Sequence, residues 1–138
     1  MTASHSAATG LAAWHDIVAN PDPAKLPDLL ADDVVFWSPV VHSPQAGRDL
    51  TTMYLLGAMQ VLLPGGFTYV REVVDGDDAV LEFTADVNGR TVNGVDMLHF
   101  NADGKIDNFT VMLRPLSGTI AVKDKMAELL AQQQRPRR

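Results

Sequence analysis

The sequence contains no cysteine, which excludes disulfide bonds, thiol nucleophiles and metal sites built from thiolates. It has no apolar run near the roughly 18–20 residues that a membrane-spanning helix needs. Its first ten residues, MTASHSAATG, have neither the basic start nor the hydrophobic stretch of a secretory signal. We therefore expect a flexible lead-in, no membrane partner and a cytoplasmic location, which the lack of cysteine permits without proving.

Positive charge is also scarce, since 11 Lys and Arg residues against 17 Asp and Glu residues give a net charge of −6. This balance opposes nucleic-acid binding, in which contacts to phosphates dominate affinity. The basic tail QQQRPRR, residues 132–138, is expected to be a solvated end. The sequence has no closely spaced set of metal ligands and no glycine-rich phosphate loop after a strand. We therefore predict no metal and no cofactor.

The 138 residues, 46% of them hydrophobic, are enough for a single domain over 1–138 with an ordered core at about 7–131. The spacing of apolar residues predicts a first helix over 7–19. Asp22 and Pro23 predict the start of a short second helix. A strand rich in β-branched and aromatic residues is expected over 32–38, and a long helix over 48–63.

Beyond residue 66 the hydrophobic period changes from 3.6 to 2. The turn sequences DGDD, NG and NADG separate strands expected at about 67–74, 79–87, 91–100 and 105–114, and a last helix is expected over about 117–131. This order predicts an α+β fold, in which a curved, cone-like antiparallel sheet wraps around helices. Such a sheet cannot close completely, so we expect a pocket at its open end.

Asp96 is a carboxylate on an otherwise apolar strand face. The two-residue Asn88-Gly89 turn pairs Leu81 with Asp96. The same face then carries Leu81, Phe83, Ala85, Leu98 and Phe100, and the opposite face carries Glu82, Val95, Met97 and His99. Beyond the 101–104 turn the register stays open, so that Asn108, Phe109 or Thr110 can come alongside.

A dry, ionised carboxylate among such neighbours is expensive, which leaves three states for Asp96. It keeps its proton because desolvation raises its pKa, it is held as an anion by donors such as Asn93, Asn108 or Trp14, or it lines a wet pocket. A purely structural role as a buried hydrogen-bonding group is a further alternative.

Two stretches, LLADDVVFWSPV after two helices and VDMLHFNADGKIDNF before the last strand, resemble the SnoaL-like branch of the nuclear transport factor 2-like superfamily. The resemblance runs from about Leu11 to Leu130. It implies a cone-like fold with a pocket, and a homodimer. The superfamily includes ketosteroid isomerases, polyketide cyclases, limonene epoxide hydrolases, dehydratases and non-catalytic binding domains, so the fold does not choose the activity.

Asp96 matches the ketosteroid isomerase Asp that stays protonated and donates to the substrate oxyanion. The isomerase's tyrosine on the first helix corresponds to Trp14, and its general-base aspartate corresponds to Ser38. The limonene epoxide hydrolase set is also incomplete, because Gly94 stands at the arginine position and Val111 at the second aspartate position. Neither familiar residue set is therefore complete.

His42, on the loop near the expected pocket mouth, is the candidate partner of Asp96, since histidine exchanges protons near neutral pH. The alternative is an exposed loop histidine. We expect His5 in the lead-in, His15 at a helix edge and His99 on the opposite strand face. The predicted pocket lining is apolar and aromatic and suits a hydrophobic ligand with one polar group: Trp14, Phe36, Tyr54, Met59, Tyr69, Leu81, Phe83 and Leu98.

These residues favour a cofactor-independent isomerase, hydrolase or cyclase acting on a small hydrophobic substrate. Asp96 would be the acid or hydrogen-bond donor, assisted by His42 and Ser38. The alternative is a non-catalytic ligand-binding or dimerisation module of the same fold. A homodimer through the sheet is expected, because the face that bears Val95, Met97, and Phe109 or Val111 has more apolar character than an outer sheet face usually tolerates.

Overall fold

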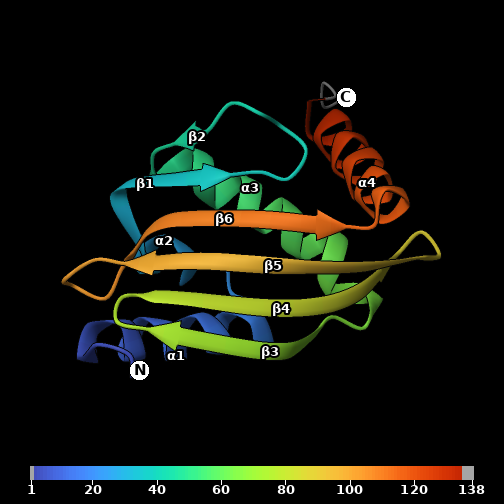
Figure 1. The fold of residues 1–138 in the computed structure, drawn as a ribbon. Helices are drawn as coiled ribbons and strands as arrows, with labels where there is room; N and C mark the ends of the chain where they lie inside the picture. Colours follow the sequence, from blue (N-terminus) through green and yellow to red (C-terminus); the bar gives the residue numbers. More distant parts are fainter. Residues whose placement is uncertain (1, 135–138) are drawn as a thin grey trace.

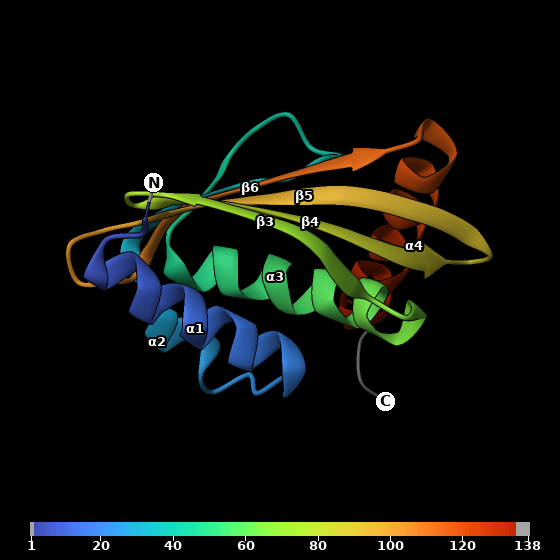
Figure 2. The same ribbon diagram turned by 60° about the horizontal axis from the view of Figure 1, so that its bottom comes forward.

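The computed structural model describes residues 2–134 and contains a six-stranded sheet with the strand order β2-β1-β6-β5-β4-β3. Helices α1, α2 and α3 cover one face of this curved sheet, and α4 lies at the end where β6 stops (Figures 1 and 2). The elements are α1 (His5–Ala19), α2 (Leu26–Leu29), β1 (Leu30–Trp37), β2 (Gln45–Ala46), α3 (Arg48–Leu62), the 3-10 turn η1 (Leu63–Gly65), β3 (Thr68–Asp75), β4 (Asp78–Val87), β5 (Arg90–Phe100), β6 (Ile106–Arg114) and α4 (Leu116–Gln134).

The predicted α+β class and the curved sheet are confirmed, with one difference in strand direction. Neighbouring strands are antiparallel except β1 and β6, which run parallel. The antiparallel prediction rested on turn sequences, and no turn links β1 to β6. Among residues 2–134, no helix is both long enough and apolar enough to cross a membrane.

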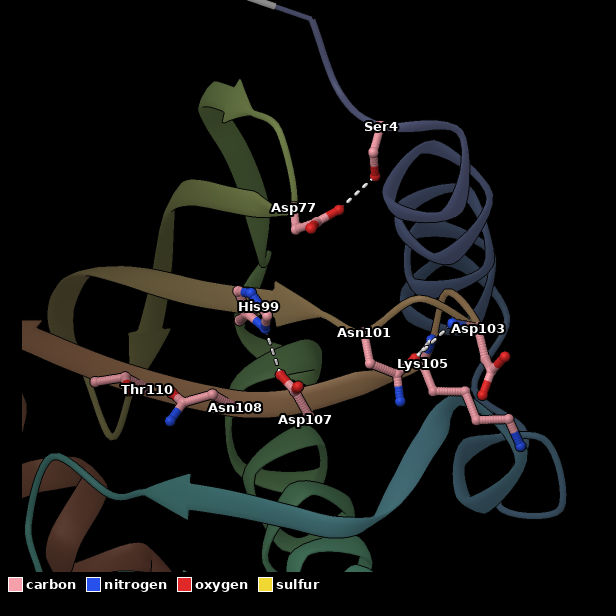
Figure 3. Close-up of polar contacts among 9 residues, drawn as sticks. All are labelled: Ser4, Asp77, His99, Asn101, Asp103, Lys105, Asp107, Asn108 and Thr110. Carbon is pink, nitrogen blue, oxygen red and sulfur yellow. Dashed lines mark hydrogen bonds and ion pairs between the residues drawn. The ribbon is translucent and has the colours of Figure 1, made fainter.

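The N-terminal lead-in is more ordered than predicted. Helix α1 begins at His5, where Ser4 caps it by accepting a hydrogen bond from the Ala7 amide. Ser4 also donates from its amide to the Gly76 carbonyl and from its hydroxyl to Asp77 (Figure 3). These bonds attach the start of the chain to the β3–β4 turn. Most of the basic tail lies outside the described residues.

The second helix begins later than predicted. The Asp22 side chain accepts a hydrogen bond from the Ala24 amide at 3.0 Å and so caps a turn, and α2 starts only at Leu26. Strand β1 starts at Leu30, and the short strand β2 occupies part of a segment expected to be loop.

The register across β4 and β5 is as predicted. Asn88 and Gly89 have φ angles of 50° and 76°, as a two-residue hairpin turn requires, and Leu81 pairs with Asp96. At the next turn, the Asn101 side chain accepts hydrogen bonds from the amides of Asp103 and Lys105 (Figure 3). This turn settles the open register.

Across β5 and β6, Asp96 pairs with Val111 and Leu98 with Phe109. Residues directly opposite each other share a sheet face, so Phe109 and Val111 point inward with Asp96. The expectation that one of them adds to the outer apolar face is therefore wrong. Met112 is on that face and is 56% exposed.

A β-bulge in β3 decides which way Tyr69 points. Arg71 pairs with Glu82 on the outer face, yet Tyr69 pairs with the next residue of β4, Phe83, so that Val70 is an extra residue. Strict alternation would place Tyr69 on the outer face with Arg71. The bulge turns it inward, onto the face that holds Asp96.

Candidate functional site

A cavity of about 220 Å³ lies between the inner face of the sheet and the helices. Its walls come from α1, α3, α4, the inner strands and the 38–41 loop, and they are mainly apolar. The lining side chains that can donate or accept hydrogen bonds are Trp14, Ser38, Tyr54, Tyr69, Asp96 and Lys123. Asp96 is the one carboxylate in this lining among the described residues.

Asp96 is only 6% exposed, and its burial has a direct effect on its charge. Desolvation raises its pKa from 3.8 to about 7, although the hydrogen bond from Tyr69 acts in the lowering direction. The first of the three predicted states is therefore substantially populated below neutral pH. A protonated carboxyl group can donate a hydrogen bond, which a carboxylate cannot.

Tyr69 holds Asp96 in place through a short chain of hydrogen bonds. The Tyr69 hydroxyl donates to Asp96 Oδ2 at 2.5 Å, and Trp14 Nε1 donates to the Tyr69 oxygen at 3.0 Å. Burial and the neighbouring charge of Asp96 raise the pKa of Tyr69 well above its ordinary value. Tyr69 therefore keeps its proton. Trp14 donates to Tyr69 and Tyr69 donates to Asp96, so both hydrogen bonds run in the same direction, toward Asp96.

The second oxygen of Asp96 is open to the cavity. Oδ1 accepts no hydrogen bond from the residues that the structure describes, whereas Oδ2 has Tyr69. In that same part of the chain, no fully buried side-chain nitrogen or oxygen lacks a partner. Because Oδ1 has none, it must be accessible, and the cavity is the space that Asp96 lines.

The predicted donors to Asp96 are placed differently. Asn93 donates to Glu82 and to the Phe83 carbonyl, and Asn108 accepts from Thr110. Trp14 acts through Tyr69 and not directly. The sequence predicted Tyr69 only as a lining residue, because nothing in the alternation of β3 signals the bulge that brings its hydroxyl to Asp96.

Neither Ser38 nor His42 is hydrogen-bonded to Asp96, and only Ser38 lines the cavity. Ser38 lines the cavity, and its hydroxyl accepts a hydrogen bond from the Val40 amide at 3.2 Å. His42 is exposed and is not among the lining residues, although its neighbour Val41 is. None of the other described histidines lines the cavity, although the His15 ring packs edge-on against Tyr69 with 5.5 Å between ring centroids.

Two of those histidines are each paired with the carboxylate of an acidic residue. His15 lies 2.6 Å from Glu72 at the helix edge. His99 lies 2.6 Å from Asp107 on the outer sheet face, and this hydrogen bond raises the pKa of His99 (Figure 3). Both positions agree with the faces that the sequence indicated.

The predicted lining is partly corrected. Trp14, Phe36, Tyr54, Met59 and Tyr69 line the cavity, whereas the following three are packed in the core: Leu81, Phe83 and Leu98. Phe67 stacks on Phe83 with 4.8 Å between ring centroids and takes the lining position in front of it. Helix α4 also lines the cavity, which was not predicted, although the spacing of Val122, Met126 and Leu130 signals a common helix face.

The structure explains why Gly94 and Val111 stand at the two positions where limonene epoxide hydrolases have an arginine and an aspartate. A Cβ atom on Gly94 would lie 2.5 Å from Phe83 Cζ and 2.8 Å from the Met112 carbonyl oxygen, so an arginine does not fit there. Val111 lines the cavity as an apolar residue beside Asp96. Among the described residues there is no group of three or more histidine, aspartate or glutamate side chains that could hold a metal ion.

The curved sheet, the helices on its concave side and the cavity between them define the nuclear transport factor 2-like class of folds. Within that class the chain belongs to the SnoaL-like domain family, whose model matches residues 11–109. No curated protein matches the sequence.

Several solved structures are similar to this chain. A steroid delta-isomerase from Pseudomonas aeruginosa is 40% identical, with a TM-score of 0.92, covering 96% of this chain and 97% of its own. An uncharacterised protein with a cystatin-like fold from Silicibacter pomeroyi DSS-3 is 32% identical, with a TM-score of 0.82, covering 88% and 85%. A putative ketosteroid isomerase from Kribbella flavida, 20% identical with a TM-score of 0.64 over 81% and 80%, shares the fold.

Proposed function

We propose that the protein is a cofactor-independent enzyme of the isomerase type, which acts on a carbonyl group of a small hydrophobic substrate. The observation that carries the proposal is Asp96, a carboxyl group with one oxygen bound by Tyr69 and the other open to an apolar cavity. The similarity to a steroid delta-isomerase, at 40% identity over nearly the whole chain, supports this reaction class over hydrolysis or cyclisation.

The geometry supports a donor role for Asp96. In an isomerisation through an enolate, negative charge develops on the carbonyl oxygen, and a donor already in place stabilises it. Neutral Asp96 supplies that donor from its free oxygen. Trp14 and Tyr69 are positioning residues, because each donates along the chain and so orients and polarises the next group.

The proton transfers at carbon need a second group, for which His42 remains our candidate, with Ser38 as an assisting residue. His42 is the one titratable side chain of the 38–47 segment, and residues 38–41 of the same segment line the cavity. For this role, the loop has to turn the imidazole toward the opening when substrate binds. Ser38 would orient the substrate, because its hydroxyl proton is not used in accepting from Val40.

The test is the isomerisation of β,γ-unsaturated ketones, one monocyclic and one steroidal, followed by the absorbance of the conjugated product. We expect Asp96→Leu to lower kcat/KM by about 100-fold or more, as loss of an oxyanion donor does. Asp96→Asn, which keeps an N–H donor, should lose less. Wild-type activity should fall as the pH rises through about 7, because ionised Asp96 cannot donate.

Asp107→Asn is the matched control, because Asp107 is a carboxylate on the outer face, paired with His99. It should leave kcat/KM unchanged, and His42→Ala should reduce it. Full activity of Asp96→Leu would contradict the donor role, and the absence of wild-type turnover across the panel would contradict the enzyme proposal.

A non-catalytic ligand-binding role is the second candidate. It is favoured by the lining, in which no histidine and no carboxylate other than Asp96 is found among the described residues. Ketones that raise the melting temperature of the wild type but not of Asp96→Leu, without any turnover, would select this role.

We also propose that two copies associate through the outer face of the sheet. Directly paired residues place one row across five strands, and most of its members are apolar: Val73, Val80, Met97, Thr110 and Trp37. Val73 is 56% exposed, and Met112 beside this row is equally exposed. A largely apolar row on the open face of a sheet is typical of an interface.

A further inference from the structure

Helix α4 closes one end of the cavity and also contributes a charged side chain to its lining. Figures 1 and 2 show α4 beyond the end of β6, and its Met126 side chain lies next to Gly57 of α3. One stripe of α4 lines the cavity, and it consists of Val122, Lys123, Met126, Ala127 and Leu130. Lys123 is the one cationic side chain in the lining among the residues that the structure describes.

Lys123 lies at the opening of the cavity, because it both lines the cavity and is exposed to solvent. Asp96 is in the interior of β5, a different element, and is buried. The cavity therefore has a hydrogen-bonding group in its wall at depth and a positive charge at its mouth, with apolar side chains between them.

The ammonium group of Lys123 has no acidic partner among the residues that the structure describes. The ion pairs found within residues 2–134, such as Arg71 with Glu82 at 3.1 Å, do not include Lys123. Its helical neighbours three and four residues away are Thr119, Ile120, Met126 and Ala127, none of them acidic. Asp124 is adjacent in sequence and so lies on another side of the helix.

Lys125, on the same helix, is different. It is not among the lining residues, and although Glu128 lies three residues away, no ion pair joins the two within residues 2–134. The two lysines have the same chemistry and nearly the same position in the chain, yet only Lys123 faces the cavity.

We infer that Lys123 determines substrate class, and that the cavity takes an apolar carbonyl compound with an anionic group, such as a carboxylate, at the end remote from the carbonyl. The inference rests on the proposed function, in which the carbonyl oxygen binds Asp96. Lys123 binds the anionic group at the mouth, where apolar walls on the cavity side weaken the screening of the charge by water.

The net charge of −6 means that a preference for anionic ligands cannot come from the protein as a whole. A protein with that charge repels anions at long range, so any preference for an anionic ligand must come from a local positive group. The size of the preference should also fall at high salt, because an exposed ammonium group is screened.

The experiment uses a pair of probes that share a shape and differ in charge, 6-acetyl-2-naphthoate and 6-acetyl-2-naphthamide. Dissociation constants are measured by titration calorimetry for the wild type, Lys123→Met and Lys125→Met. We expect the wild type to bind the carboxylate about five- to tenfold more tightly than the amide at low salt. Lys123→Met should remove this ratio and leave amide binding within about twofold, whereas Lys125→Met should keep the ratio.

Equal affinity of the wild type for both probes would overturn the role of Lys123 and leave the cavity proposal intact. A loss of the ratio in Lys125→Met as large as in Lys123→Met would also overturn it, since the effect would then come from the general charge of α4. Binding of neither probe, in a wild type that unfolds cooperatively, would overturn both proposals. Asp96→Leu separates them further, because it should weaken both probes while keeping their ratio.

Discussion

At the scale of single residues, the low exposure of Asp96 and its hydrogen bond from Tyr69 act on its pKa in opposite directions. Desolvation is the larger effect, and the pKa therefore rises to about 7. Of the site as a whole, Asp96 was predictable, because alternation and a two-residue turn fix the face of its strand. The hydroxyl that holds it was not, because Val70 is an ordinary strand residue and gives no signal of the bulge.

A raised pKa makes the stability of the fold depend on pH. The unfolded chain releases the Asp96 proton near pH 3.8 and the folded chain near pH 7, so the folded state binds more protons between these values. Asp96 therefore lowers the free energy of unfolding as the pH rises through this window, by on the order of 4 kcal/mol in total. Above pH 7 the loss is complete.

We expect Asp96→Asn to remove this dependence, because asparagine does not ionise and still accepts from Tyr69. Relative to the wild type, its free energy of unfolding should increase by several kcal/mol between pH 4 and pH 8. Denaturant unfolding at a series of pH values measures this difference, with Asp107→Asn as a control for general charge effects. Parallel pH profiles for wild type and Asp96→Asn would show that Asp96 is solvated.

At the scale of elements, local sequence signals and long-range pairing differ in how far they could be predicted. Helix and strand order followed from periodicity, and the β4–β5 register followed from the Asn88-Gly89 turn. The parallel β1–β6 pair did not, since residues far apart in sequence form it and no turn fixes its direction. Asp22 gave the right local interaction, a side-chain cap, but at a turn and not at a helix.

Two helical glycines give a direct test of how the helices pack. A Cβ atom on Gly10 in α1 would lie 2.3 Å from the Gly104 carbonyl oxygen, a backbone atom. A Cβ atom on Gly57 in α3 would meet the ends of two side chains, Met126 Cε at 3.2 Å and Leu129 Cδ2 at 3.6 Å. Both substitutions gain the same helix propensity, so their difference reports on packing.

We expect Gly10→Ala to destabilise the fold by about 1–3 kcal/mol, because α1 must move away from the β5–β6 turn. Gly57→Ala should change stability by less than about 1 kcal/mol, in the stabilising direction if Met126 adjusts freely. Chemical denaturation of both variants against the wild type measures this, and equal effects would contradict the close contact of α1.

At the scale of the whole molecule, the two faces of the sheet have different uses. The concave face packs against helices and holds the cavity, with the largest buried side chains Phe83, Phe100 and Phe109 on it. The outer face leaves a largely apolar row open to solvent across five strands. The row includes residues of β1 and β6, so it forms only when the parallel pair is in place.

If two copies associate through this row, a charge in its centre should separate them. We expect light scattering after size exclusion to give twice the mass of the chain for the wild type and the mass of one chain for Met97→Glu, because two glutamates would then face each other without water. Leu116→Glu is the control, since Leu116 is 75% exposed and lies outside the row. A wild type that elutes as a single copy at micromolar concentration would contradict the interface.

The bulge at Val70 affects how related sequences should be aligned with this one. In a relative whose third strand lacks the extra residue, the inward-facing position comes directly before the residue that corresponds to Arg71. An ungapped alignment would then place that inward residue in the column of Val70 and compare Tyr69 with a residue on the opposite face. A one-residue gap therefore has to be placed at Val70 before the residue aligned with Tyr69 is compared. Only then does the alignment indicate whether a related chain can present a phenol to the carboxyl group at position 96.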